Sequence, residues 1–301
     1  MNKFTLIGLI GRTNSGKSTL LNNFIGKKIA AVSNRVNTTR TPLSGIYKTD
    51  TNSFLILDAP GVCQVKTVLD RLIFQNILKI VEISDVIWWM ISCEDQWKKD
   101  NQILAKVLEN TKKPVLLLLN KVDLIEKNIL LKHIQNFSSK FPFNEVVPLS
   151  AKKKINFHNL IKATEKYLPS FSVQKNIPNF SLNTLSEIAS EIIREQILLQ
   201  IKDEIPHQTA LLKERFFQNK QNTSLFFTLL VGSSSQKAIV IGKNGERVRQ
   251  IRLKSQELLI KIWKKKVSIF LQIKVSEKWF QDVKILQKLG INWDNYEYTR
   301  K

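Results

Sequence analysis

Four short polar segments in the first half of the sequence each follow a run of apolar residues. They are Gly11–Thr19 (GRTNSGKST), Asp58–Gly61 (DAPG), Asn120–Asp123 (NKVD) and Ser150–Lys153 (SAKK). Backbone N–H groups exposed by glycine, a lysine ammonium and a serine hydroxyl are groups that bind phosphate and Mg²⁺. Amide and carboxylate side chains can hydrogen-bond a base. This order of segments predicts a site for a nucleoside polyphosphate.

The segment Gly11–Thr19 has the spacing G-x4-G-K-[ST], and it lies between an apolar run and a stretch of helical period. In that context this spacing forms a phosphate-binding loop. Lys17 would reach the β and γ oxygens, and the Ser18 hydroxyl would ligate Mg²⁺. We therefore expect phosphate contacts from Gly11, Arg12, Thr13, Asn14, Ser15, Gly16, Lys17, Ser18 and Thr19.

The tetrapeptide DAPG follows the apolar run FLIL and so stands at the expected end of a strand. From there Asp58 could hold Mg²⁺ through water, and the Gly61 N–H could meet the γ-phosphate. Alone, such a tetrapeptide is a weak signal, but its place after the phosphate loop gives it weight. The nucleotide contacts expected from this region are Asp58, Ala59, Pro60, Gly61 and Val62.

The segments NKVD and SAKK point to guanine as the base. The Asp123 carboxylate can accept two hydrogen bonds from the N–H donors of guanine, and adenine presents no such pair. The Asn120 amide and the Lys121 stem would also contact the base, and the Ala151 N–H could donate to the guanine O6. Base contacts are expected from Asn120, Lys121, Val122, Asp123, Ser150, Ala151 and Lys152.

Short apolar runs alternate with stretches of helical period over the first half of the chain, and each polar segment follows a run. The alternation predicts an α/β fold with a mostly parallel sheet. The run VIWWMIS is typical of a strand covered on both faces, which places Trp88 and Trp89 in the core. Strands are expected over Phe4–Ile10, Phe54–Leu57, Val86–Ile91, Val115–Leu119 and Val146–Leu149, and helices over Leu69–Val81, Asn101–Leu108, Asn128–Phe137 and Leu160–Leu168.

Pro169 and Pro178 bracket a polar stretch in which the apolar periodicity stops. We predict a linker over 169–183, between a first domain over 1–168 and a second over 184–301. The second domain reads as α+β. Its expected elements are helices over Thr184–Ile201, Glu246–Trp263 and Lys278–Leu289, strands over Thr209–Phe217, Leu225–Val231, Ala238–Ile241 and Val267–Val275, and a turn at GKNG.

The net charge of +22 and the pI near 9.9 favour a polyanionic partner, either nucleic acid or an anionic membrane surface. The window Lys237–Lys266 carries a net +8 in 30 residues. Inside it, VIGKNGERVRQI contains the G-x-x-G loop of KH domains, which clamp single-stranded RNA by its backbone. RNA contacts are expected from Ile241, Gly242, Lys243, Asn244, Gly245, Arg247 and Arg249.

The nucleotide motifs resemble those of the translation-factor-related GTPases. NTTRTP (Asn37–Pro42) is similar to their first switch, in which the second threonine, here Thr39, binds Mg²⁺ only when the γ-phosphate is present. Val62 replaces the water-positioning glutamine of Ras-like enzymes, as in K⁺-assisted GTPases whose asparagine at the position of Asn14 helps bind K⁺. The resemblance implies GTP or GDP, Mg²⁺ and K⁺ as cofactors. It implies Ser18, Thr39 and Asp58 as metal ligands and Asn14, Lys17, Thr39 and Gly61 as catalytic residues.

Over essentially the whole chain, the order of parts is similar to that of the Era family of ribosome-assembly GTPases. The most specific pieces outside the two sites are SEIIREQ (Ser190–Gln196) and Trp279. The resemblance implies a type II KH domain that binds the 3′ end of small-subunit (16S) ribosomal RNA with support from GTP. It further implies a role in maturation of the small ribosomal subunit and some peripheral attachment to the inner membrane. Thr13, Ser15 and Arg252 depart from the family's usual residues.

Two other interpretations stay open from the sequence. One is a peripheral membrane GTPase whose basic domain binds anionic lipid; the GKNG loop counts against it, because a lipid patch does not need that loop. The other is a scaffold that binds GTP without hydrolysis, and the intact set Lys17, Ser18, Thr39 and Asp58 argues against it. We expect a cytoplasmic monomer. The two cysteines have no paired spacing, so neither a disulfide nor a zinc site is expected.

Overall fold

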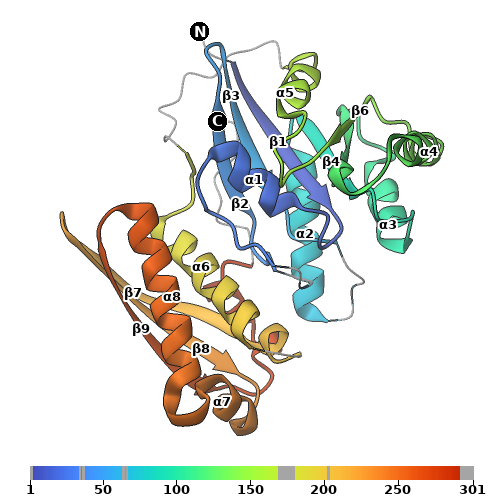
Figure 1. Ribbon diagram of the computed structural model, residues 1–301. Helices are drawn as coiled ribbons and strands as arrows, with labels where there is room; N and C mark the ends of the chain where they lie inside the picture. Colours follow the sequence, from blue (N-terminus) through green and yellow to red (C-terminus); the bar gives the residue numbers. More distant parts are fainter. Residues whose placement is uncertain are drawn as a thin grey trace.

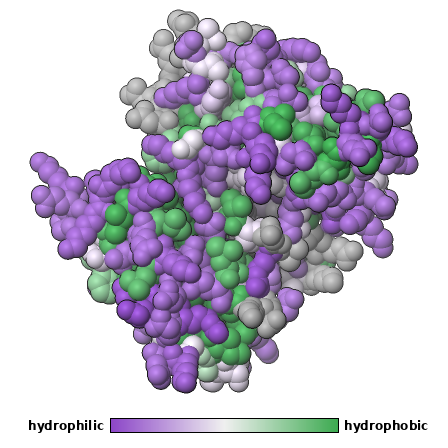
Figure 2. Space-filling view, in the orientation of Figure 1, coloured by the Kyte–Doolittle hydropathy of each residue, from purple (hydrophilic) through white to green (hydrophobic). Residues whose placement is uncertain are grey.

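The computed structural model describes residues 3–33, 35, 38–62, 65, 67–168, 180–201 and 204–291. Three of the sequence predictions fall outside this part of the chain: Asn37 of the expected switch, Cys63, and most of the linker over 169–183. The described residues form two units, each built on its own sheet, as Figure 1 shows. In the same orientation, Figure 2 shows a mostly hydrophilic surface with scattered hydrophobic patches. None of their helices is long and apolar enough to cross a membrane.

The first unit contains a six-stranded sheet in the order β2-β3-β1-β4-β5-β6. All neighbouring strands pair in parallel except β2, which pairs antiparallel with β3. Helices α1 and α5 cover one face, and α2, α3 and α4 cover the other. The strands are β1 (Lys3–Gly11), β2 (Leu43–Lys48), β3 (Asn52–Asp58), β4 (Val86–Ser92), β5 (Val115–Asn120) and β6 (Glu145–Leu149), and the helices are α1 (Lys17–Ile25), α2 (Val68–Ile83), α3 (Lys99–Leu108), α4 (Lys127–Ser138) and α5 (Phe157–Glu165).

The central strands are apolar along their whole length because both faces of the sheet are covered. Trp88 and Trp89 are fully buried on opposite faces, as predicted. The Trp88 indole donates a 3.0 Å hydrogen bond to the Thr164 hydroxyl of α5. Trp89 packs among other aromatic rings, of which Phe141 and Phe143 lie edge-on to it. These contacts fix the strand ends that carry the polar segments.

The second unit contains a three-stranded sheet in the order β7-β8-β9. Strand β8 pairs antiparallel with β7 and parallel with β9. Helices α6 and α8 pack together on one face, as Figure 1 shows. The elements are α6 (Leu185–Gln200), β7 (Ala210–Gln218), β8 (Asn222–Val231), α7 (Ser234–Ile241), α8 (Glu246–Trp263), β9 (Lys266–Val275) and α9 (Val283–Lys288). Short 3₁₀ turns cover Val122–Leu124, Ile205–Gln208, Lys243–Gly245 and Trp279–Gln281.

The structure corrects the sequence prediction at three elements. The segment Ala238–Ile241, expected to be a strand, is the end of helix α7. Ser233 caps this helix, because its side chain accepts a hydrogen bond from the Gln236 N–H at 3.2 Å. Strand β2 was not predicted; it is a short edge strand whose apolar pattern is broken by Gly45. The helix predicted over Lys278–Leu289 is divided at Asp282, whose backbone is extended, into a 3₁₀ turn over Trp279–Gln281 and the shorter helix α9 over Val283–Lys288. The remaining predicted elements are present, with ends that differ by a few residues.

Candidate functional site: a nucleotide cavity and a glycine loop

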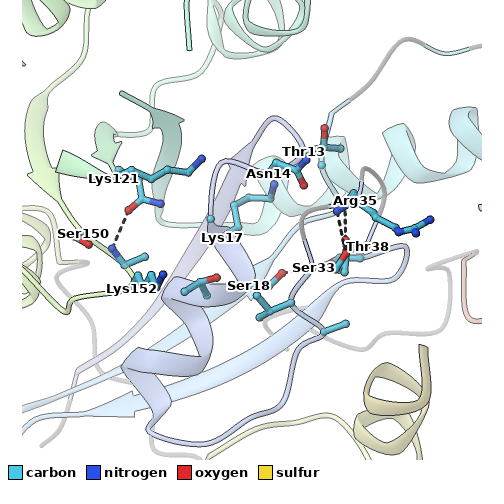
Figure 3. A pocket seen from close by; sticks show the side chains of 18 of the residues that line it. Thr13, Asn14, Lys17, Ser18, Ser33, Arg35, Thr38, Lys121, Ser150 and Lys152 are labelled. Atoms are coloured by element: carbon cyan, nitrogen blue, oxygen red, sulfur yellow. Dashed lines mark hydrogen bonds between the residues drawn. The ribbon is translucent and has the colours of Figure 1, made fainter. Parts of the chain in front are cut away.

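A cavity of about 610 Å³ opens where β1, β3, β5 and β6 end, which is a usual size for a small-molecule site. Figure 3 shows Lys17 and Asn14 projecting into its middle, Lys121 and Ser150 on one side and Arg35 and Thr38 on the other. The structure therefore gathers the four polar segments around one space. The predicted residues that line it are Thr13, Asn14, Gly16, Lys17, Ser18, Thr19, Thr39, Gly61, Asn120, Lys121, Asp123, Ser150, Ala151 and Lys152.

The phosphate loop wraps because its glycines adopt conformations closed to other residues. Gly16 caps α1 with φ 104°, and a Cβ there would lie 2.1 Å from the Asn120 Nδ2. The Lys17 ammonium donates to the carbonyls of Gly11 and Arg12 at 3.1 and 2.8 Å. Burial lowers the pKa of Lys17 to about 8, and the Asp58 carboxylate opposes the shift. A phosphate beside this ammonium would favour its charged form.

Three predicted metal ligands meet beside the loop. The Ser18 hydroxyl donates to Asp58 Oδ2 at 2.7 Å and lies 3.1 Å from the Thr39 hydroxyl. Burial raises the pKa of Asp58 to about 6, against the lowering effects of Lys17 and the Ser18 hydrogen bond. Asp58 Oδ1 is buried and has no hydrogen-bond partner among the described residues. Two hydroxyls and a carboxylate with an unsatisfied oxygen fit Mg²⁺ and its bound water.

At the base end of the cavity, Asn120 links two loops. Its Nδ2 donates to the Ser15 carbonyl at 2.6 Å, and its Oδ1 accepts from the Ala151 N–H at 2.8 Å. The structure thus differs from the prediction in which the Ala151 N–H is available to guanine, because this N–H already has a partner. The Lys121 ammonium pairs with Glu94 at 2.7 Å, and this lowers the pKa of Glu94.

Some predicted nucleotide contacts lie beneath or outside the cavity wall. The Arg12 guanidinium pairs with Asp95 and Asp100, each at 3.0 Å, and so points away from the cavity. Val62 is 1% exposed, and its N–H donates to the Gly11 carbonyl at 3.1 Å. These residues support the loop from behind. The predicted residues that do not line the cavity are Gly11, Arg12, Ser15, Asp58, Ala59, Pro60, Val62 and Val122.

Several residues on the switch side of the cavity lie outside the contacts predicted from the sequence. No spacing rule marks them, since they reach the cavity only because the chain after α1 folds back over the phosphate loop. Ser33 and Thr38 hydrogen-bond each other at 2.8 Å across this segment, as Figure 3 shows. These lining residues are Ala31, Val32, Ser33, Arg35 and Thr38, and at the base end Leu124, which directly follows the NKVD segment, also lines the cavity.

The GKNG loop joins α7 to α8. Gly242 has φ 74°, and a Cβ there would lie 2.8 Å from the Arg247 Cβ, so only glycine fits. Lys243 and Asn244 are exposed at the tip, ahead of the N-terminus of α8. Two predicted RNA contacts are already engaged within the protein: Arg247 donates to the Ile239 carbonyl, and Arg249 pairs with Glu246 at 3.3 Å.

Comparisons with known proteins find a family match in each of the two units. A family described as "50S ribosome-binding GTPase" matches residues 6–121, and a family described as "KH domain" matches residues 217–280. The GTPase Era of Lactobacillus helveticus is 33% identical over 290 residues, which are 96% of each protein. The GTPase Era of Geobacter metallireducens is 32% identical over 288 residues, 94% of this chain and 96% of the relative. The chain belongs to the Era GTPase family.

Solved structures of Era proteins have the same fold throughout. Era in complex with MgGDPNP and nucleotides 1506–1542 of 16S ribosomal RNA superposes with a TM-score of 0.91 at 27% identity, covering 97% of this chain and 99% of that one. A single-residue variant of Aquifex aeolicus Era bound to GDP·AlF4⁻ gives a TM-score of 0.89 at 27% identity, covering 96% and 99%. The two-sheet architecture of this Era-family chain is therefore that of its relatives.

In this Era-family chain, helix α6 of the second unit holds the switch segment in place. The Arg194 Nε donates to the Thr38 carbonyl at 2.8 Å, and Glu195 accepts from the Val32 N–H at 3.2 Å and pairs with Lys28. Thr38 directly precedes Thr39, the switch residue beside Ser18. The nucleotide cavity is thus braced by the other domain.

A second interdomain contact comes from Arg40, which follows Thr39. It is 5% exposed and donates to the carbonyls of Thr209 and His207 at 2.7 and 2.6 Å. Its guanidinium lies 5.4 Å from the centre of the Trp279 ring. A displacement of the switch threonine would therefore disturb bonds to the second unit of this Era-family protein.

Proposed function

We propose that this chain is a GTP-binding and GTP-hydrolysing switch that uses its KH domain to bind the 3′ end of small-subunit ribosomal RNA during assembly of the small subunit. The observation that carries the proposal is the gathering of Ser18, Thr39 and Asp58 beside a phosphate loop, in a chain that also presents an exposed GKNG loop. The Era structure bound to MgGDPNP and 16S rRNA supports the same assignment.

The proposal divides the chain into a GTPase domain over 1–168, a linker over 169–183 and a KH domain over 184–301. Mg²⁺ would be held by Ser18, Thr39 and Asp58. The partner is ribosomal RNA in the cytoplasm, the protein acts as a monomer, and peripheral attachment to the inner membrane is a further part of the proposal.

Hydrolysis by the isolated protein is expected to be slow, on the order of 10⁻³ s⁻¹, because Val62 cannot orient the attacking water. If Asn14 helps hold K⁺, replacing K⁺ by Na⁺ slows turnover in wild type. The variant Asn14→Gly removes this side chain but tolerates the native φ of 61°. It should hydrolyse GTP at one rate in both salts; wild-type rates that are equal in K⁺ and Na⁺ would remove K⁺ from the proposal.

The RNA assignment is tested at the tip of the GKNG loop. Replacing Lys243 and Asn244 by Asp puts negative charge against the RNA backbone and should weaken binding by about tenfold or more. Fluorescence anisotropy with a single-stranded oligonucleotide from the 3′ end of small-subunit rRNA measures the loss. GTP binding should be unchanged, because the nucleotide cavity lies in the other domain.

A matched control changes the same residue types elsewhere. The pair Asn110→Asp and Lys112→Asp alters the net charge equally at exposed positions after α3, and should weaken RNA binding less than about twofold. A duplex of equal length should bind less well than the single strand, since KH domains read unpaired bases. Equal losses in the two variants would contradict the proposal. Binding to anionic vesicles that the loop variant abolishes would favour the membrane interpretation instead.

A further inference from the structure

The face of the KH sheet that lies opposite α6 and α8 is covered only in part by the described residues. At one end, Leu230 packs in a cluster with Trp279 and Leu286 from the segment after β9. At the other end, Phe217 and Phe270 are 58% and 52% exposed, although phenylalanine is a residue that folding normally buries. Such exposure on a sheet face indicates a contact surface.

The exposed phenylalanines form an ordered group. Phe226 and Phe270 are paired across β8 and β9, and their rings stack with centroids 4.5 Å apart and planes at 7°. Phe217 lies edge-on to Phe226, at 5.9 Å and 89°. Strand β9 is the edge of the sheet, so no described strand lies beyond Phe270. The ring of Phe270 therefore ends the stack.

The stack borders a basic hollow that is also lined by α8, the helix that follows the GKNG loop. Phe226 and Phe270 line a hollow of about 820 Å³ together with Arg215, Arg252 and Lys274. Glu214 is the one carboxylate of that lining among the described residues. Helix α8 begins at the GKNG loop, and Arg252 lies seven residues after Gly245, about 10 Å along the helix axis. Figure 1 shows α8 running beside the sheet that carries β9.

Flat exposed rings surrounded by cations fit one class of ligand, a strand with unpaired bases and a phosphate backbone. Aromatic side chains bind such strands by stacking on the bases, while basic side chains neutralise the phosphates. A protein partner would not need the three cations around the rings. The charges of the hollow thus favour single-stranded nucleic acid as its occupant.

We propose that the Phe226–Phe270 stack binds an unpaired base of the same RNA strand that the GKNG loop clamps. The proposal rests on the RNA-binding function above and extends it. A KH domain clamps about four nucleotides, so the stacked base lies outside those four. Arg252 and Arg215 neutralise the phosphates on either side of it.

The test compares two oligonucleotide lengths. Anisotropy titrations with four-nucleotide and ten-nucleotide single strands from the 3′ end of small-subunit rRNA give the gain in affinity that length provides. In Phe270→Ala, binding of the longer strand should weaken between about 5-fold and about 150-fold, the range of one stacked base. Binding of the tetranucleotide should stay as in wild type. Phe270→Tyr keeps an aromatic face and should keep the gain.

Controls separate stacking from folding and from charge. Leu199→Ala removes an equally exposed apolar side chain from α6 and should change neither affinity. Phe270→Ala should leave the salt dependence of binding unchanged, whereas Arg252→Gln should reduce its slope, because only the latter removes a phosphate contact. If Phe270→Ala weakens both lengths equally, or neither, the proposal is wrong. The variant of Lys243 and Asn244 tests the RNA-binding function on its own. If the GKNG loop does not bind RNA, this variant binds the tetranucleotide as wild type does.

Discussion

At the scale of single residues, burial sets the charge of the groups that would handle the nucleotide. Lys17 and Asp58 are both buried, and burial moves both pKa values toward neutrality. The phosphates of a bound nucleotide would favour the charged ammonium of Lys17, and Mg²⁺ would favour the charged carboxylate of Asp58. The cavity is thus tuned to a ligand that carries phosphate and a divalent cation together.

The preference for guanine over adenine nucleotides depends on Asp123, which lines the cavity at the end away from the switch. A site built on buried hydrogen bonds rejects a ligand that leaves them unmade by roughly 10⁴-fold or more. In competition binding, GTP and GDP should displace a labelled guanine nucleotide and ATP should not. Asp123→Asn should weaken GTP binding and favour xanthosine triphosphate, whose ring carries a carbonyl in place of the guanine amino group. ATP binding comparable to that of GTP would contradict the assignment.

The ionisation of Glu191 in α6 should make the free energy of unfolding depend on pH. Its pKa is raised to about 7, mainly by burial and also by the nearby Asp58 carboxylate, against the lowering effects of Arg194 and Arg40. The folded protein therefore holds a proton on Glu191 below about pH 7, whereas the unfolded chain holds it only below about 4.5. This stabilising contribution is complete below pH 4.5 and is lost as the pH rises through 7.

We expect wild type to lose about 1 kcal/mol of unfolding free energy between pH 6 and pH 8 relative to Glu191→Gln, because the variant cannot ionise there. Denaturant unfolding followed by circular dichroism at both pH values measures the difference. The exposed Glu257→Gln on α8 serves as the control and should follow wild type. Parallel curves for wild type and Glu191→Gln would show that Glu191 is ionised in the folded state at pH 6.

At the scale of elements, α6 joins the two functions. Its Arg194 fixes the Thr38 carbonyl, and through it the position of Thr39 beside Ser18. Arg194→Lys keeps the charge but loses the Nε–H donor. GTP should then bind about tenfold more weakly, since a hydrogen bond to a charged group is removed, while GDP binding stays unchanged because Thr39 is expected to bind Mg²⁺ only beside the γ-phosphate.

Equilibrium titrations with labelled GDP and a non-hydrolysable GTP analogue measure the ratio of the two affinities. Arg71→Lys, at an exposed position of α2, is a matched control that should leave the ratio as in wild type. A ratio that also stays constant in Arg194→Lys would mean that α6 does not position the switch.

The elements differ in how far the sequence could predict them. The strands of the parallel sheet are apolar runs that end in, or just before, a glycine or a polar residue, and this pattern identifies them. The sequence predicts a strand at the end of α7 because AIVI is rich in β-branched residues, a preference that the Ser233 cap and the packing of the buried Val240 override. The phosphate loop could be predicted because its contacts are local. Arg40 could not, since its partner Thr209 lies 169 residues away.

At the scale of the whole molecule, the switch segment is shared between the domains. Arg40 and Thr38 bond to Thr209 and Arg194 of the second unit, and Thr39 between them lies beside Ser18, which itself bonds Asp58. We therefore expect a change at the γ-phosphate to alter the hydrogen bonds that hold the second unit in position. Coupling of this kind is reciprocal: if GTP favours RNA binding, RNA favours GTP by the same factor.

The most direct test of this account measures RNA affinity in two nucleotide states. The whole chain is saturated with Mg²⁺ and either a non-hydrolysable GTP analogue or GDP, and titrated against the ten-nucleotide strand by anisotropy. The account predicts tighter binding with the GTP analogue, by about 5-fold to 150-fold, the usual range of coupling between two sites. Arg40→Gln should bind both nucleotides yet lose most of this difference. Equal RNA affinities of the wild-type protein in the two states would contradict the account.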